Sequence, residues 1–441
     1  MASSAYCRRL EAVLFAGLLL AATPAARGSE KSEKVAAGDS PAQSVPDKQK
    51  QIATEASNMP FVYTKWEQFT TKDGLPNDHI FAVKVFGDYV WVGTEDGLAR
   101  LNKKTREIKC WREEDGLPWR VVGAIDVHPK TDEVWLGLFG GGLARFSGGR
   151  FDHWHQLNSG LVNDVVYGVA IEHDNVWAAT TAGASRYNTV TGEWSIFTEK
   201  NAPMEEIWNY GVCYADGLVY LGVWGSGVLE YNVERGTWKD YLDPDGEMEI
   251  DLYRDDGIMH VITTGVSYVD QTLWAASYFG VGRYDGRHWR CFFAHESGLP
   301  SDFTNAVKGR SAHEAWFATD KGLGVLADFG TDTWVTYTSD HDAHKGKAVV
   351  QRGEKIIAEF ETMLNLPHNY VLWVEFDGDD AWIGTSKGLG HAIGECYFPR
   401  LRNEKQIAQA IRDAIIFRDA TLHRDATVRE PVANAEMQNS E

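Results

Sequence analysis

The chain repeats one short phrase seven times, and this repetition limits the possible folds more than any other feature. The first copy is VWVGT at 90–94: an apolar residue, an aromatic one, an apolar one, then Gly or Ala. The central aromatics are Trp91, Trp135, Trp177, Tyr220, Trp274, Trp316 and Trp382, at spacings of 44, 42, 43, 54, 42 and 66 residues. A period of about 40–45 residues with several strands is typical of propeller blades. The sequence therefore predicts an all-β, seven-bladed β-propeller over 59–399.

Turn residues divide each period into four short strands. In the first period we expect strands at 79–86, 89–94, 98–101 and 107–111, because Gly, Asp or Asn stands between them. These residue types adopt the backbone angles of tight turns. The aromatic residue of the second strand should fill the space between adjacent blades.

The two ends of the repeat region predict how the ring closes. Residues 66–69 followed by DGLP at 73–76 match a fourth strand and its exit loop, as Trp111 does before DGLP at 115–118. The seventh repeat, after Trp382, lacks an outer strand of its own. We expect the N-terminal strand to complete the last blade, which leaves no exposed sheet edge at the junction.

The phrases WVGTEDGL at 91–98 and WIGTSKGL at 382–389 resemble the two-component regulator propeller repeat. The recurrent Gly-Leu-Pro-Asn/Ser-Asp before an inner strand is similar to it as well. The resemblance covers roughly 61–399. It implies a ligand-sensing propeller of the kind often found in the periplasm on hybrid sensor kinases, although this sequence shows no kinase region and no DNA-binding segment.

The segments outside the repeats predict export and flexible ends. Residues 1–28 combine a basic start at Arg8 and Arg9, a short apolar run and small residues, as a signal peptide does. Residues 29–58 and 425–441 have the polar composition of a disordered linker and tail. Isoleucines four residues apart within 400–424 predict an amphipathic C-terminal helix. These features predict a periplasmic or extracellular protein.

Charge and composition limit the partners. The net charge of −20 makes nucleic acid an unfavourable partner. No apolar run is long enough to span a bilayer, so we expect no membrane span. The partners that fit are a small polar ligand, a glycan or peptide, or an envelope protein.

The candidate site lies at one mouth of the central channel, where the loops into the inner strands converge. Aligning the repeats places six polar residues at nearly equivalent positions: Asp78, Arg120, Asp164, His260, Asp302 and Asn369. The same loops and those between second and third strands supply an aromatic rim that includes Trp119, Trp208, Trp224 and Tyr278. Flat rings beside carboxylates suit sugar or peptide recognition, and packing between blades is the alternative.

Other roles for these residues remain open at this stage. Asp78, Asp164 and Asp302 could bind a divalent cation, although they could equally cap their own loops. No cofactor is otherwise expected. His79, His260 and His368 are the candidate bases if the protein is an enzyme.

Two insertions extend the repeats. The acidic segment 243–249 is expected to be a solvated loop. Residues 339–367 are expected to form a lid over the mouth, with His341 and His344 as a possible metal pair.

No catalytic motif stands out, so the leading hypothesis is an exported propeller that binds a ligand or partner, in a sensing or scaffold role. The alternative is a metal-dependent propeller lyase or glycan-active enzyme, because streptogramin lyases share the predicted fold. A structural hub in an envelope complex is the third possibility.

Overall fold

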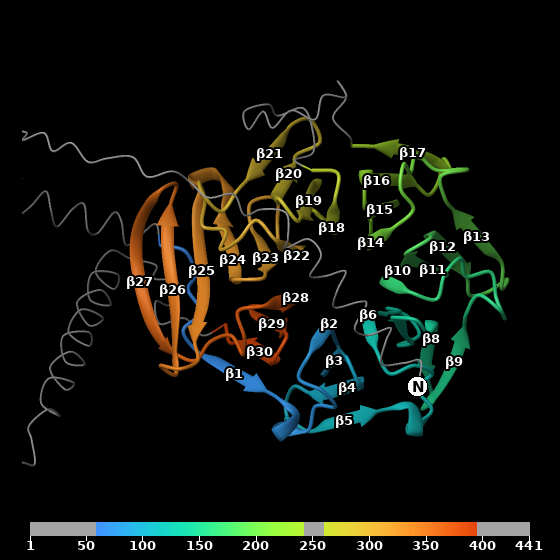
Figure 1. The fold of residues 1–441 in the computed structure, drawn as a ribbon, viewed down its shortest axis with the longest axis horizontal. Helices are drawn as coiled ribbons and strands as arrows, with labels where there is room; N and C mark the ends of the chain where they lie inside the picture. The colour runs from blue at the N-terminus through green and yellow to red at the C-terminus, as the bar shows by residue number, and fades with distance from the viewer. Residues whose placement is uncertain (1–58, 242–259, 395–441) are drawn as a thin grey trace, which may run out of the picture. The chain divides into compact units, whose positions relative to one another are not determined.

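Seven antiparallel sheets surround a central axis in the computed structural model, which describes residues 59–241 and 260–394 (Figure 1). The predicted all-β, seven-bladed β-propeller is confirmed. The predicted signal peptide (1–28), linker (29–58), acidic loop (243–249), C-terminal helix (400–424) and tail (425–441) lie outside the described residues.

Each blade runs from an inner strand at the axis to an outer strand at the rim. The inner strands of blades 1 to 7 are β2 (Ile80–Phe86), β6 (Val122–Val127), β10 (Val166–Glu172), β14 (Asn209–Ala215), β18 (Thr263–Val269), β22 (Thr304–Gly309) and β28 (Val371–Asp377). The second strands are β3 (Tyr89–Thr94), β7 (Val134–Leu138), β11 (Asn175–Thr180), β15 (Leu218–Val223), β19 (Thr272–Ser277), β23 (Ala315–Thr319) and β29 (Asp380–Thr385). The third strands are β4 (Gly97–Asn102), β8 (Gly142–Ser147), β12 (Gly183–Asn188), β16 (Gly227–Asn232), β20 (Gly280–Tyr284), β24 (Gly322–Asp328) and β30 (Gly388–Ala392). The outer strands are β5 (Ile108–Trp111), β9 (Arg150–Trp154), β13 (Trp194–Phe197), β17 (Thr237–Asp240), β21 (Trp289–Phe292), β25 (Thr333–Asp340) and β1 (Trp66–Phe69), and three short 3-10 turns are η1 (Thr71–Asp73), η2 (Glu113–Asp115) and η3 (Phe329–Thr331).

The N-terminal strand closes the ring, as predicted. Strand β1 pairs antiparallel with β30, from Trp66 opposite Ala392 to Phe69 opposite Leu389. Each inner strand contacts the inner strands on both sides, and β28 contacts both β22 and β2, so the circle is complete. Because β1 is the outer strand of a blade whose other strands come last in the sequence, the two ends of the fold hold each other in place.

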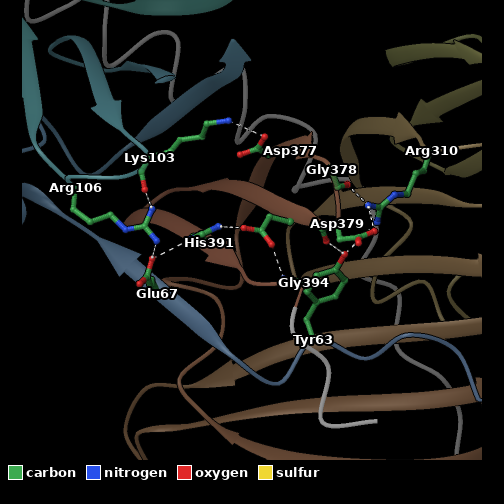
Figure 2. Close-up of polar contacts among 11 residues, drawn as sticks. Tyr63, Glu67, Lys103, Arg106, Arg310, Asp377, Gly378, Asp379, His391 and Gly394 are labelled. Atoms are coloured by element: carbon green, nitrogen blue, oxygen red, sulfur yellow. Dashed lines mark hydrogen bonds and ion pairs between the residues drawn. The ribbon is translucent and has the colours of Figure 1, made fainter. Parts of the chain in front are cut away.

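Polar side chains reinforce this junction (Figure 2). His391 on β30 contacts Glu67 on β1 through Nδ1 at 3.0 Å and Asp380 on β29 through Nε2 at 2.8 Å. Arg106 from blade 1 reaches the same Glu67 carboxylate at 2.6 Å. Lys103, also from blade 1, pairs with Asp377 of blade 7 at 2.8 Å. The junction therefore joins β1, the last blade and the first blade by charge as well as by backbone pairing.

The repeated aromatic residue packs between blades, as predicted. All seven are buried, with exposures of 5% or less. Trp91 of blade 1 contacts Phe146 of blade 2, with ring centroids 5.8 Å apart, and Trp316 of blade 6 contacts Phe376 of blade 7 at 5.4 Å. An arginine from the third strand lies over this aromatic ring in four blades, at Arg100, Arg145, Arg186 and Arg283. Such cation–π contacts add to the packing energy of the ring.

The glycine that follows each phrase is required by the backbone. In each blade the third strand begins with a glycine at positive φ, and these φ angles range from 64° to 141°. At Gly183 an added Cβ would lie 2.3 Å from the carbonyl oxygen of Phe197 on the outer strand. The hydroxyl of Thr180 donates to the carbonyl of this glycine at 2.8 Å, which fixes the turn. The sequence Gly/Ala-Thr-x-x-Gly is thus a turn that only glycine can complete without strain.

The expected lid over 339–367 is wrong. After β25, strands β26 (Lys345–Arg352) and β27 (Lys355–Met363) continue the sheet of blade 6 outward, so that it has six strands. Strand β26 pairs with β25, and β27 pairs with β26. Alternating residues suit a half-exposed strand, and the hairpin lies at the outer edge of the propeller (Figure 1).

Charged residues also tie the inner strands together. Lys84 on β2 pairs with Asp126 on β6, and Lys308 on β22 pairs with Glu375 on β28, both at 2.9 Å. All four residues lie opposite the repeated aromatic of their own blade. Burial opposes the charge of Lys84, but the carboxylates of Asp126 and Glu375 outweigh it and raise the lysine pKa.

Candidate functional site

Two repeated positions build the rim of the channel mouth. One is the residue just before each inner strand, and the other is the first residue of the loop between the second and third strands. In blades 1–4, 6 and 7 the N–H of the second donates to the carbonyl of the first, at 2.8–3.3 Å. The rim pairs are His79 with Glu95, Val121 with Phe139, Val165 with Thr181, Trp208 with Trp224, Phe303 with Asp320 and Tyr370 with Ser386. Side chains far apart in the sequence are thereby fixed at one opening.

A β-bulge near the start of every inner strand adds another ring of residues. The strand pairing skips one residue in each blade: Phe81, Gly123, Tyr167, Tyr210, Thr264, Asn305 and Leu372. Bulges redirect a side chain out of the regular alternation. Where the bulge residue is Gly123, the ring of Phe139 occupies the space, since an added Cβ would lie 2.1 Å from it.

Aromatic side chains form a continuous arc around most of the mouth. We call the following residues the aromatic arc: Phe81, Phe139, Tyr167, Trp208, Tyr210, Trp224, Tyr278 and Phe303. Successive rings touch, with centroids 5.1 Å apart for Phe81 and Phe139, 5.8 Å for Trp208 and Trp224, and 4.2 Å for Tyr278 and Phe303. All eight side chains are half-buried. The arc therefore offers ring faces and edges to a ligand above a well-packed base.

Three phenol groups at the mouth remain neutral. Burial is the main cause that raises the pKa of both Tyr210 and Tyr278, and the two side chains hydrogen-bond to each other. Burial, with smaller effects of Tyr278 and Asp320, also raises the pKa of Tyr370 to about 12. Neutral phenols keep both a donor and an acceptor for a polar ligand.

The predicted aromatic residues fall in two places. Trp208, Trp224 and Tyr278 lie together in the arc. Trp119 is 38% exposed beside the arc, and its Nε1 donates to the carbonyl of Phe139 at 2.7 Å. Phe279, which follows Tyr278, is 49% exposed and lies against His260, with ring centroids 4.0 Å apart and 30° between the planes.

The predicted carboxylates hold their own loops. Asp78 accepts the N–H of Thr71 at 2.6 Å, Asp164 that of Gln156 at 2.7 Å, and Asp302 that of Ala294 at 2.7 Å. Asn369 accepts the N–H of Ser339 at 2.8 Å in the same way. These four side chains occupy equivalent positions, as the repeats predict. Each caps a backbone N–H of its own loop, which is the alternative role that the sequence left open. In 59–241 and 260–394, no three His, Cys, Asp or Glu side chains are grouped so as to hold a metal ion.

Arg120 occupies the same position in the loop into blade 2 but makes different contacts. Its Nε lies 3.4 Å from Asp96 and donates to the carbonyl of Glu95 at 3.3 Å.

His260 is displaced by one residue from the predicted alignment. Val261 is the equivalent of Asp302, because its carbonyl accepts the N–H of Gly227 at 3.0 Å just as the carbonyl of Asp302 accepts that of Gly280 at 2.8 Å. His260 corresponds instead to Asn163, whose side chain accepts the N–H two residues later. The alignment error arose because the sequence of this loop has no Gly-Leu-Pro to mark its register.

Two of the candidate bases have their Nδ1 lone pair engaged. Nδ1 of His260 accepts the N–H of Ile262 at 3.1 Å, and Nδ1 of His368 accepts that of Tyr370 at 3.0 Å. The neutral ring must then carry its proton on Nε2. Burial lowers the pKa of both, and Lys387, His341 and His79 lower that of His368 further. Both rings are therefore held as neutral hydrogen-bond donors. The third candidate, His79, lies 3.8 Å from Glu95 and stacks on Phe81.

Sequence reasoning missed several residues at the mouth. Phe81, Tyr167 and Tyr210 lie at the bulges, which no turn residue indicates. An aromatic residue two positions after the rim position would have predicted them.

Other side chains near the mouth also make notable contacts. His341 stacks on His368 with centroids 5.9 Å apart. Trp208 Nε1 and Asp320 Oδ1 are buried without a hydrogen-bond partner in the described chain.

Comparison with solved structures finds this fold in sensor domains and in an enzyme, among other proteins. No family model matches the chain. Two extracellular domains assigned to hybrid two-component systems of B. thetaiotaomicron superpose with TM-scores of 0.56 and 0.53, at 12% and 14% identity, over 75% and 76% of this chain and 40% and 42% of theirs. The predicted resemblance to two-component regulator propellers is confirmed at the level of the fold, which is what similarity at this identity shows.

Two further proteins are similar to this chain or to part of it. "Histidine kinase P4" of Formosa agariphila is 25% identical over 165 residues, which are 35% of this chain and 11% of the kinase. Virginiamycin B lyase of Staphylococcus aureus has a TM-score of 0.50 at 14% identity, over 74% of this chain and 98% of the lyase. The chain thus spans less than half of the sensor proteins it matches. In the part of the chain that the structure describes, no helix is long and apolar enough to cross a membrane.

Proposed function

We propose that the chain is an exported recognition propeller that binds a small polar ligand, a glycan, a peptide or an envelope protein at its channel mouth, in a sensing or scaffold role. One observation carries the proposal. The mouth presents a contiguous aromatic arc, whereas the three aspartates and two of the three candidate histidines accept hydrogen bonds from the backbone of their own loops. Ligand recognition needs an accessible aromatic surface. Catalysis needs acid and base groups that are free to exchange a proton with the substrate.

The contacts of the histidines argue against the lyase alternative. A general base needs an accessible lone pair, and those on Nδ1 of His260 and His368 already accept backbone N–H groups. The three aspartates are engaged in the same manner. Similarity to virginiamycin B lyase at 14% identity concerns the fold, which does not carry function by itself.

The comparisons support a sensing role outside the cytoplasm. The neighbouring propellers are extracellular domains of two-component systems. The predicted signal peptide at 1–28 agrees with a periplasmic or extracellular location. The hydrogen bonds of the three aspartates to their own loops disfavour a divalent cation there.

The proposal is tested by thermal-shift measurements on the protein with neutral and acidic oligosaccharides, short peptides and Ca²⁺. A compound that binds the native state raises the melting temperature by mass action. Trp208→Ala should abolish the rise produced by any compound that binds the mouth. Trp238→Ala is the matched control, since Trp238 is a half-buried tryptophan of the same blade that lies on the outer strand β17.

The outcomes separate the hypotheses. A rise that Trp208→Ala removes and Trp238→Ala preserves supports recognition at the mouth. A rise that survives Trp208→Ala rejects this site. Chemical conversion of a bound compound during incubation, followed by mass spectrometry, would reject the non-catalytic role.

A further inference from the structure

Four of the seven loops repeat one side-chain contact, and three lack it because Arg120, Ile207 and Val261 stand at its position. In the loops into blades 1, 3, 6 and 7, an Asp or Asn side chain accepts a backbone N–H at 2.6–2.8 Å. This N–H belongs to the second residue after the last residue pair between the third and outer strands of the preceding blade. The loop into blade 2 has Arg120 at this position. A guanidinium has no acceptor, so this position cannot cap the equivalent N–H, which belongs to Glu113.

The rest of this loop is unchanged. Asp115 accepts the N–H of Arg112 at 3.0 Å, as Asp73 accepts that of Thr70 at 2.8 Å in the loop into blade 1. The N–H of Leu117 donates to the carbonyl of Arg112 at 3.1 Å, like its counterpart in the loop into blade 1. The loop therefore keeps its shape without the carboxylate, and the difference is confined to one side chain.

A pocket of about 330 Å³ lies at this place. It is lined by Asp96, Arg112, Glu113, Glu114 and Arg120. Asp96 stands between the two arginines, 3.5 Å from Nε of Arg112 and 3.4 Å from Nε of Arg120. Because Arg120 contacts the described protein through Nε, its two Nη groups remain as donors for an occupant.

The charges around the pocket restrict the occupant. Three carboxylates face two guanidinium groups, so a simple anion would add to an excess of negative charge. A simple cation would leave the Nη donors and the N–H of Glu113 without an acceptor. A ligand with a carboxylate and an ammonium group close together meets both requirements.

We propose that this pocket binds a free α-amino acid. Its carboxylate takes the place of the carboxylate that Asp78 supplies in the loop into blade 1, and accepts from Arg120 and the N–H of Glu113. Its ammonium group faces the carboxylates of Glu113 and Glu114. This site lies between blades 1 and 2 and is separate from the aromatic arc, so it is a second recognition site beyond the proposed function.

Isothermal titration calorimetry of the full chain with glycine, L-alanine and L-glutamate tests the proposal. Acetate and ethylamine, which carry one charge each, should bind at least tenfold more weakly than L-alanine. Arg120→Asp introduces the carboxylate found in the loops into blades 1, 3 and 6. It should weaken amino-acid binding at least tenfold while the melting temperature stays equal or rises.

Two controls keep the result specific. Arg150→Asp makes the same charge change on the exposed outer strand of blade 2 and should leave binding within twofold. Trp208→Ala should also leave it unchanged, so failure here and failure of the mouth proposal are distinguishable. Absence of amino-acid binding, equal binding of acetate, or full binding by Arg120→Asp would overturn the proposal.

Discussion

The imidazole of His391 lies flat on the indole of Trp382, with ring centroids 3.9 Å apart and 5° between the planes. Both nitrogens of this ring face carboxylates, those of Glu67 on β1 and Asp380 on β29. Because Glu67 comes from the N-terminal strand, the contact joins the two ends of the propeller (Figure 2). Ring closure therefore depends on the stacked His391 side chain, which contacts carboxylates through both ring nitrogens, as well as on four pairs of strand residues.

Replacing His391 with Ala should lower the free energy of unfolding by about 1–3 kcal/mol, because it removes the stacking and takes one hydrogen-bond partner from each of two carboxylates. Those carboxylates are 40% and 31% exposed, so water offsets part of the loss. Urea denaturation measures the effect. His288→Ala, at an exposed turn, should change the value by less than about 0.5 kcal/mol. Equal effects of the two variants would show that the contacts of His391 do not stabilise the closure of the propeller.

Removing Arg186 should be more costly. Its guanidinium bonds both oxygens of Glu172 at 2.8 and 2.6 Å, and Glu172 is 2% exposed. Arg186→Ala leaves a buried carboxylate whose remaining partners include the indole N–H of Trp177, so we expect a loss of about 3–5 kcal/mol. The double variant Arg186→Ala/Glu172→Gln should recover part of that loss in the same denaturation experiment. No recovery would mean that the arginine acts through packing alone.

Gly183→Ala should lower the free energy of unfolding by about 2–3 kcal/mol, since it forces a side chain into positive φ and toward a carbonyl. Gly217→Ala is the matched control: its φ is also positive, at 79°, but nothing lies within 4 Å of the added Cβ. There we expect only the conformational cost of about 1–2 kcal/mol. If both variants lose the same stability, steric contact with the outer strand is not what requires glycine.

Stability should fall as the pH drops below about 6.5, the ordinary pKa of histidine. The pKa values of His368 and His260 are lowered in the folded chain, so the unfolded chain binds more protons in this range. A falling pH therefore stabilises the unfolded state relative to the folded one. His368→Asn keeps the acceptor that Asn163 supplies in blade 3 and removes the titration. Melting temperatures between pH 5 and 8 should therefore vary less in this variant than in the wild type. An unchanged pH profile would assign the acid sensitivity to other groups.

The fold could be predicted from the sequence because its determinants are periodic. The repeated aromatic, the glycine at positive φ and the loop aspartates all recur in register, and the outer strand at 66–69 was recognisable by comparison with Trp111. The hairpin β26–β27 could not be placed in this way, because alternating residues at 345–363 indicate strands without saying which edge they join.

The candidate site was only partly predictable, because position along the chain does not determine what a side chain contacts. The alignment located Asp78, Asp164 and Asp302 correctly, but it could not show that each carboxylate binds its own loop. The bulge aromatics Tyr167 and Tyr210 were missed because strand alternation alone would not place them at the mouth.

The most direct test of recognition at the mouth is an NMR spectrum of the indole N–H groups of the 17 tryptophans, recorded with and without a compound that raises the melting temperature. Binding at the aromatic arc predicts shifts for Trp208 and Trp224, while the repeated tryptophans buried between blades keep their positions. Single Trp→Phe variants assign the signals. Shifts confined to outer-strand tryptophans such as Trp194 and Trp238 would contradict the account and move recognition to the rim of the blades.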